Sequence, residues 1–97
     1  MPKGYWIVRV DVTNPDGYAP YAAAAGPAVA KFGGKYLARG GKSEALQGTA
    51  RARNVIVEFP SYQAAVDAWN SPEYQAAKKF RDGNCEAEWV VVEGFEA

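Results

Sequence analysis

The residues best suited to chemistry in this chain are an arginine and two glycines, Arg39-Gly40-Gly41, at the end of a short apolar run. A guanidinium presents donors in a planar fork, and glycines let a ligand approach the backbone N–H groups. The group therefore predicts an anion-binding site. The alternative is structural: Arg39 forms an ion pair with Glu58 or Glu93, and the glycines only turn the chain.

Glu58 is the candidate catalytic acid or base. A carboxylate between Val57 and Phe59 has a raised pKa if no cation lies close to it. A glutamate held in an ion pair is the alternative.

Three further side chains complete the predicted site. Arg9 would anchor the anion together with Arg39, and Asn54 would either orient a ligand carbonyl or satisfy backbone groups. Tyr18 would line a cleft with its hydroxyl, as Tyr21 and Tyr74 also would, although aromatic residues at helical spacing are typical of a core.

These residues share a position in alternating runs. In residues 5–12, one face carries Trp6, Val8 and Val10. The same alternation in residues 35–40, 53–59 and 86–93 predicts an apolar face with Trp6, Val8, Val10, Ala38, Val55, Val57, Val90 and Val92. The opposite, mixed face would carry Arg9, Asp11, Lys35, Arg39, Asn54, Glu58 and Glu93. This face would carry three cations and three anions. Such a balance fits a structural ion-pair network, because an unpaired buried charge costs several kcal/mol.

Composition excludes several classes of function. The 97 residues contain no histidine, which removes the commonest general base and transition-metal ligand, so we expect no metal and no cofactor. Eleven basic and eleven acidic residues give no net charge, which argues against nucleic-acid binding. One cysteine, with no signal peptide or long apolar run, favours a cytoplasmic protein without a membrane segment.

Element signals give the order βαββαβ. A helix starts after Asn14-Pro15, with a kink expected at Gly26-Pro27, and a second helical region starts at Ser61 and breaks at Asn70-Ser71. Residues 42–52 form a long connection, either a flexible flap or an extended hairpin arm. We expect one domain, residues 1–97: a ferredoxin-like α+β fold with a four-stranded antiparallel sheet. The basic run Lys78, Lys79 and Arg81 fits a solvated helix face.

Helices would cover only one face of this sheet. The other face would retain apolar side chains among its charges: Tyr5, Ile7, Leu37, Ile56, Trp89 and Val91. An isologous dimer is the simplest cover for such a face, so we predict a homodimer.

Five strings in order along the whole chain carry a family resemblance: residues 4–6 (GYW), 32–41 (FGGKYLARGG), 57–62 (VEFPSY), 71–74 (SPEY) and 92–94 (VEG). Together they resemble the small bacterial proteins of the domain of unknown function 1330 family. The resemblance implies a ferredoxin-like dimeric α/β barrel, a shape shared with cofactor-independent oxygenases, isomerases and proteins without known chemistry. It implies no established activity, substrate or catalytic residue.

The leading hypothesis is a small homodimer that binds a small anionic or aromatic organic molecule in a cleft between sheet and helices. Any catalysis would be a cofactor-independent isomerase, lyase or oxygenase step in which Glu58 moves a proton. The alternative is a non-enzymatic structural or interaction module whose polar sheet face serves only dimerisation.

Overall fold

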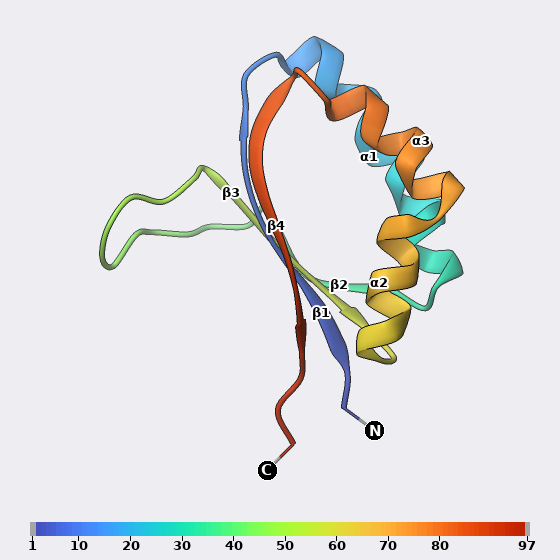
Figure 1. Cartoon of the computed structure of the whole chain (residues 1–97). Coiled ribbons are helices and arrows are strands. Elements are labelled where there is room, and N and C mark those ends of the chain that lie inside the picture. The colour runs from blue at the N-terminus through green and yellow to red at the C-terminus, as the bar shows by residue number, and fades with distance from the viewer. Residues whose placement is uncertain (1, 97) are drawn as a thin grey trace.

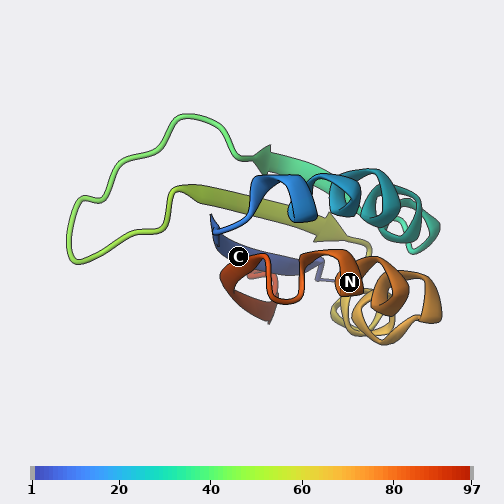
Figure 2. The same ribbon diagram turned by 90° about the horizontal axis from the view of Figure 1, so that it is seen from above.

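A computed structural model describes residues 2–96. The elements follow in the order β1 (Gly4–Val12), α1 (Pro15–Lys31), β2 (Lys35–Arg39), β3 (Arg53–Phe59), α2 (Tyr62–Asn70), α3 (Pro72–Arg81) and β4 (Cys85–Glu93). The strands pair antiparallel in one sheet with the order β2-β3-β1-β4. All three helices lie on one face of it (Figures 1 and 2). The predicted ferredoxin-like α+β fold is confirmed.

Capping residues set the helix boundaries on the second half of the chain. The Ser61 hydroxyl accepts a hydrogen bond from the Ala64 backbone N–H (3.0 Å), and the Ser71 hydroxyl accepts one from Tyr74 (3.1 Å). Ser71 thus ends α2 and starts α3, where the sequence predicted a break. In contrast, α1 continues through Gly26-Pro27 to Lys31.

Trp6 is the centre of the core. Its indole is 2% exposed, and its Nε1 donates to the Ala65 carbonyl oxygen at 2.9 Å, which ties β1 to α2. Four aromatic rings surround it at centroid distances of 4.9–6.2 Å: Phe59, Trp69, Tyr74 and Trp89. Edge and tilted contacts of this kind stabilise a core beyond the burial of area alone.

The predicted phase of β4 is wrong. Trp6 pairs with Val91 and Val8 pairs with Trp89, so Trp89 and Val91 face the helices. Val90 is 54% exposed and lies on the uncovered face, as does Val92. Glu93 was also assigned to the wrong face, since it lies opposite Gly4. The run from 89 to 92 is entirely apolar and carries no alternation, so pairing with β1 sets its phase.

A β-bulge overturns the predicted position of Arg39. Tyr36 pairs with Val57, but after a register shift Ala38 pairs with Ile56 and Arg39 with Val55. The extra residue reverses the alternation, so Arg39 lies on the helix-covered face and Ala38 on the other. Both had been predicted on the opposite faces, because a strict period of two contains no signal for one inserted residue.

Residues 40–52 form an arm that continues from β2 and β3 beyond the sheet and away from the helices (Figures 1 and 2). Leu46 in this arm is 92% exposed. The connection is extended, and residues 42–52 form neither helix nor strand. Within residues 2–96, no helix combines the length and apolar character needed to cross a bilayer.

Candidate functional site

A pocket lies between α1 and the sheet. We call it the arginine pocket and define it by Tyr18, Tyr21, Tyr36, Arg39 and Arg53 at its polar side. Its apolar wall comes from the sheet and α1: Trp6, Val8, Val10, Val55, Val57, Trp89, Ala22 and Ala25. It encloses about 30 Å³, room for a single water molecule.

Gly40 places the two arginines at the mouth of this pocket. Its φ of +70° is a left-handed conformation that favours glycine, and its N–H donates to the Asn54 carbonyl oxygen at 2.9 Å. A Cβ at this position would collide with Nη1 of Arg53. The neighbouring Arg39 is exposed, with its guanidinium carbon 4.2 Å from the Tyr36 ring centroid. Gly41 has open space around it.

The arginine pocket holds positive charge without a matching carboxylate. No acidic side chain lines it, and within residues 2–96 neither Arg39 nor Arg53 forms an ion pair. Burial raises the pKa of Tyr18 and of Tyr36, although the arginine charges act in the opposite direction. The tyrosines are therefore neutral donors at neutral pH, and the pocket offers cations and donors to an anion.

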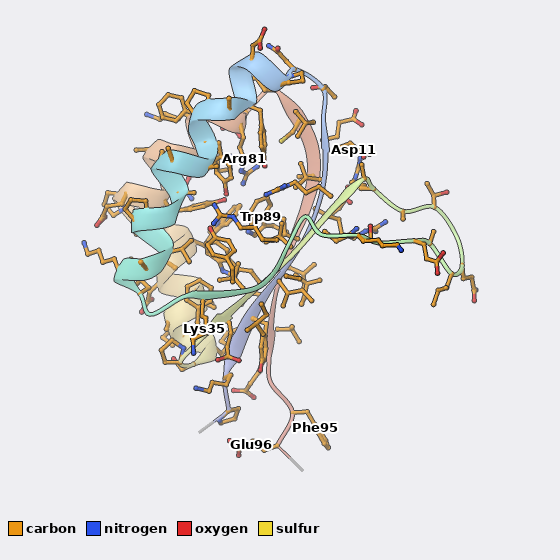
Figure 3. All side chains as sticks on the ribbon, turned by 180° about the vertical axis from the view of Figure 1, so that it is seen from behind. Asp11, Lys35, Arg81, Trp89, Phe95 and Glu96 are labelled. Atoms are coloured by element: carbon orange, nitrogen blue, oxygen red, sulfur yellow. The ribbon has the colours of Figure 1, made fainter. Side chains whose placement is uncertain are left out.

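Arg81 lies behind the arginine pocket. It is 6% exposed, and its guanidinium carbon is 4.1 Å from the Trp89 ring centroid and 5.6 Å from that of Tyr21. Figure 3 shows Arg81 and Trp89 between the helices and the sheet. Arg81 Nε and Trp89 Nε1 are buried without a hydrogen-bond partner in the described chain. Buried donors without a partner are rare in native structures.

A second cavity lies on the other side of the Trp6–Trp89 pair, below α2. It encloses about 270 Å³, and its lining is entirely apolar or aromatic: Trp6, Ala65, Val66, Trp69, Trp89 and Val91. We call it the tryptophan cavity. A cavity of about 150 Å³ can hold benzene, so this one accommodates a larger apolar group. It offers no charge for an anion.

The uncovered sheet face, called the open face below, uses its charges to hold the arm. Arg51 binds Glu88 through two hydrogen bonds (2.6 and 2.7 Å) and Asp11 through a third (2.8 Å), with Glu86 at 3.6 Å. Asp11 also accepts from the Ala52 N–H at 2.8 Å, and Figure 3 shows Asp11 at the base of the arm. Each of these three carboxylates therefore has Arg51 as its partner.

Two predicted ligand-binding residues belong to this arrangement. Arg9 donates to the Thr49 carbonyl oxygen at 2.9 Å, and Asn54 donates to the Ser43 hydroxyl at 3.2 Å. Both side chains thus secure the arm on the open face, opposite the arginine pocket. Glu58 is also on this face, with its carboxylate 4.0 Å from Lys3 Nζ. The structure does not bring these three residues together with Arg39.

The structure therefore divides the predicted site. Arg39, Tyr18 and Gly40 meet at the arginine pocket, whereas Arg9, Asn54 and Glu58 lie on the open face. Sequence reasoning missed Arg53 and interpreted Arg81 as solvated. One signal was available: the spacing of Tyr74, Ala77 and Arg81 by three and four residues places Arg81 on the buried side of α3.

One protein family matches almost the whole chain. A family model described as a domain of unknown function (DUF1330) matches residues 3–95. The chain belongs to the DUF1330 family. No curated protein matches it.

Solved structures share the fold of this DUF1330 protein. The crystal structure of RPA0582, a protein of unknown function from Rhodopseudomonas palustris, matches with a TM-score of 0.79 and 21% identity, over 99% of this chain and 85% of that one. The cofactor-independent oxygenase SnoaB from Streptomyces nogalater matches with a TM-score of 0.61 and 10% identity, over 100% of this chain and 97% of that one. At these identities the likeness shows the fold alone.

Proposed function

We propose that this protein binds a small aromatic carboxylate in the arginine pocket and does so as a homodimer. The observation that supports the proposal is the gathering of Arg39 and Arg53 around tyrosine and tryptophan rings with no carboxylate in the pocket. Arginine forks bind carboxylates through paired charge-assisted hydrogen bonds, and the tyrosine hydroxyls add neutral donors.

The aromatic walls of the pocket favour a ligand with an aromatic ring, and the small size of the pocket limits where that ring can lie. Tyr36 and Trp89 offer aromatic faces, but the enclosed space holds only about one water molecule. Arg39 is the exposed side chain that occupies the Tyr36 face. In the proposed complex the ligand ring replaces Arg39 on Tyr36, and the displaced guanidinium pairs with the ligand carboxylate.

An uncovered apolar row on the open face supports the proposed homodimer. Ala38, Ile56, Ile7 and Val90 lie directly opposite one another across all four strands. Ile7 is 37% exposed and Val90 54%. Exposed apolar patches of this kind mark contact surfaces, and a second copy of the same face is self-complementary.

Isothermal titration calorimetry tests the binding proposal with benzoate, cinnamate and 2-naphthoate, each compared with its neutral carboxamide. We expect at least one carboxylate to bind and its amide to bind at least about tenfold more weakly, since a hydrogen bond to a charged group contributes about 1.5–3 kcal/mol. Arg53→Gln should weaken binding of the carboxylate by a similar factor. Arg51→Gln, which neutralises an arginine on the open face, is the matched control and should leave binding unchanged.

A second variant locates the ligand. Val66→Phe fills the tryptophan cavity and should not affect carboxylate binding. If no carboxylate binds, or amides bind equally well, the proposal is wrong and the non-enzymatic dimerisation module is the better interpretation. If Val66→Phe blocks binding and Arg53→Gln does not, the ligand occupies the tryptophan cavity and the arginine pocket is not the site.

Cofactor-independent chemistry on the bound anion is a second candidate, supported by the shared fold with the oxygenase SnoaB. The arginines would stabilise negative charge on the substrate. Glu58 lies on the other face, so the substrate would have to enter as an anion or lose its proton to solvent. Oxygen consumption with 1-naphthol as the probe tests this. Uptake that Arg53→Gln abolishes supports it, and no uptake above the buffer rate contradicts it for this probe class.

A further inference from the structure

The buried guanidinium of Arg81 is attached to a chain of two tyrosine hydroxyls. Arg81 Nη2 donates to Tyr74 Oη at 3.2 Å, and Tyr74 Oη lies 2.8 Å from Tyr21 Oη. Tyr74 is 0% exposed, whereas Tyr21 lines the arginine pocket. The chain therefore runs from the end of α3 to the ligand side of α1.

The available donors and acceptors favour one direction for these hydrogen bonds. Arginine has no acceptor, so the Tyr74 oxygen receives the Arg81 proton and the Tyr74 proton needs another acceptor. Within residues 2–96 the Tyr21 oxygen is the one acceptor within reach of the Tyr74 hydroxyl. If Tyr21 donated to Tyr74 instead, the fully buried Tyr74 proton would have no partner, at a cost of about 1–3 kcal/mol. The favoured order is Arg81 to Tyr74 to Tyr21.

In this order the Tyr21 proton is left for a group in the pocket. Burial raises the pKa of Tyr21 and of Tyr74, so both hydroxyls keep their protons at neutral pH. Arg81 remains a donor at any physiological pH, so the Tyr74 oxygen has a partner without Tyr21, and reversing the order would only leave the Tyr74 proton unpaired.

We propose that Arg81 and Tyr74 are positioning residues that make Tyr21 an obligatory hydrogen-bond donor to the ligand. The preferred ligands are then aromatic carboxylates with a second acceptor oxygen on the ring, such as a ketone. This rests on the proposed function, because it assumes that the carboxylate is held by Arg39 and Arg53. The further inference is that the end of the ligand away from its carboxylate accepts a hydrogen bond from the Tyr21 hydroxyl on α1.

Matched probes test this proposal. 3- and 4-acetylbenzoate carry a ketone oxygen, and 3- and 4-isopropylbenzoate have nearly the same shape without it. In the wild type, the better acetyl isomer should bind about tenfold more tightly than its isopropyl counterpart, as expected from one satisfied buried donor. Tyr21→Phe should abolish this preference while the difference between carboxylates and carboxamides persists.

Variants of Arg81 separate positioning from mere stability. In Arg81→Met, the Tyr74 oxygen loses its donor. The original order then leaves this acceptor unpaired and the reversed order leaves the Tyr74 proton unpaired, so the two orders become similar in energy and the acetyl preference should shrink. In Arg81→Lys, a donor is restored and the preference should return. A purely structural Arg81 would weaken acetyl and isopropyl probes equally. If Arg81→Met does not fold, Tyr21→Phe and Arg81→Lys carry the test.

The outcomes distinguish this inference from the function on which it rests. Carboxylate-dependent binding with equal affinities for acetyl and isopropyl probes would overturn the hydroxyl chain alone. Absence of binding by every carboxylate would overturn the function and this inference together.

Discussion

The two faces of the single sheet differ in what each one lacks. The helix-covered face has a complete apolar core around Trp6, but the arginines on and behind it have no carboxylate partner in the described chain. On the open face the carboxylates of Asp11 and Glu88 are bound to Arg51, but the apolar row across the strands is uncovered.

The missing part of each face indicates the nature of its partner. An unmatched guanidinium beside aromatic rings calls for an anion, because an uncompensated charge in a partly buried site is costly. An uncovered apolar row on a face that also carries ion pairs favours contact with a second apolar surface. The number of charges is thus less informative than whether each charge has a partner.

The largest expected effect is on assembly. Val90→Asp places a carboxylate at the β4 end of the apolar row, where dimerisation would bury it without a partner, so we expect the proposed homodimer to become a monomer. Multi-angle light scattering at micromolar concentration measures this as a halved mass.

Phe80→Asp is the control for this change. Phe80 is 46% exposed on α3, similar to Val90, but belongs to the helix layer. Its substitution should leave the mass unchanged. A wild-type protein that is monomeric, or a Val90→Asp variant that stays dimeric, would show that the apolar row is not the interface.

An intermediate effect is expected at the two glycines that follow Arg39. Gly40→Ala forces a left-handed conformation on alanine and pushes Arg53, so stability should fall by about 1–3 kcal/mol and benzoate-type binding should weaken. Gly41→Ala has open space and an ordinary φ, so stability should stay the same or rise by about 0.4–1 kcal/mol. Thermal melts of the pair measure the difference, and equal losses at both positions would contradict the role of Gly40.

The sequence predicted the elements because their signals are local. Ser61 and Ser71 cap their helices through their own first turns, and the order of elements restricts the fold to few topologies. The position of Arg39 depends instead on the register of β2 against β3, where one inserted residue reverses the face. No local pattern in residues 35–39 indicates that bulge.

The candidate site was predicted only in part for the same reason. Tyr18 and Arg39 meet Arg53 through the packing of α1 on the sheet, which is a long-range contact. Arg9 and Asn54 were assigned to a ligand because the sequence does not show that the arm returns to bind them. The sequence shows which residues are charged but not which of them pair with one another.

The smallest expected effect separates the two faces by pH. Hydrogen bonding from the Ala52 N–H and from Arg51 lowers the pKa of Asp11 below its usual 3.8. A folded-state pKa below the unfolded value stabilises the fold above about pH 3.8, and this contribution is lost as pH falls through the lowered pKa.

On acidification the Ala52 amide should therefore shift in NMR spectra below pH 3.8, as its carboxylate acceptor is protonated. The Gly40 amide donates to a backbone carbonyl and should remain unshifted through the same titration. If both amides change together, the fold unfolds as a whole and the ion pairs of the arm are not a separate unit. If Ala52 alone responds, the open face loses the Asp11–Arg51 ion pair while the arginine pocket keeps its geometry, which is the independence that the two-face comparison requires.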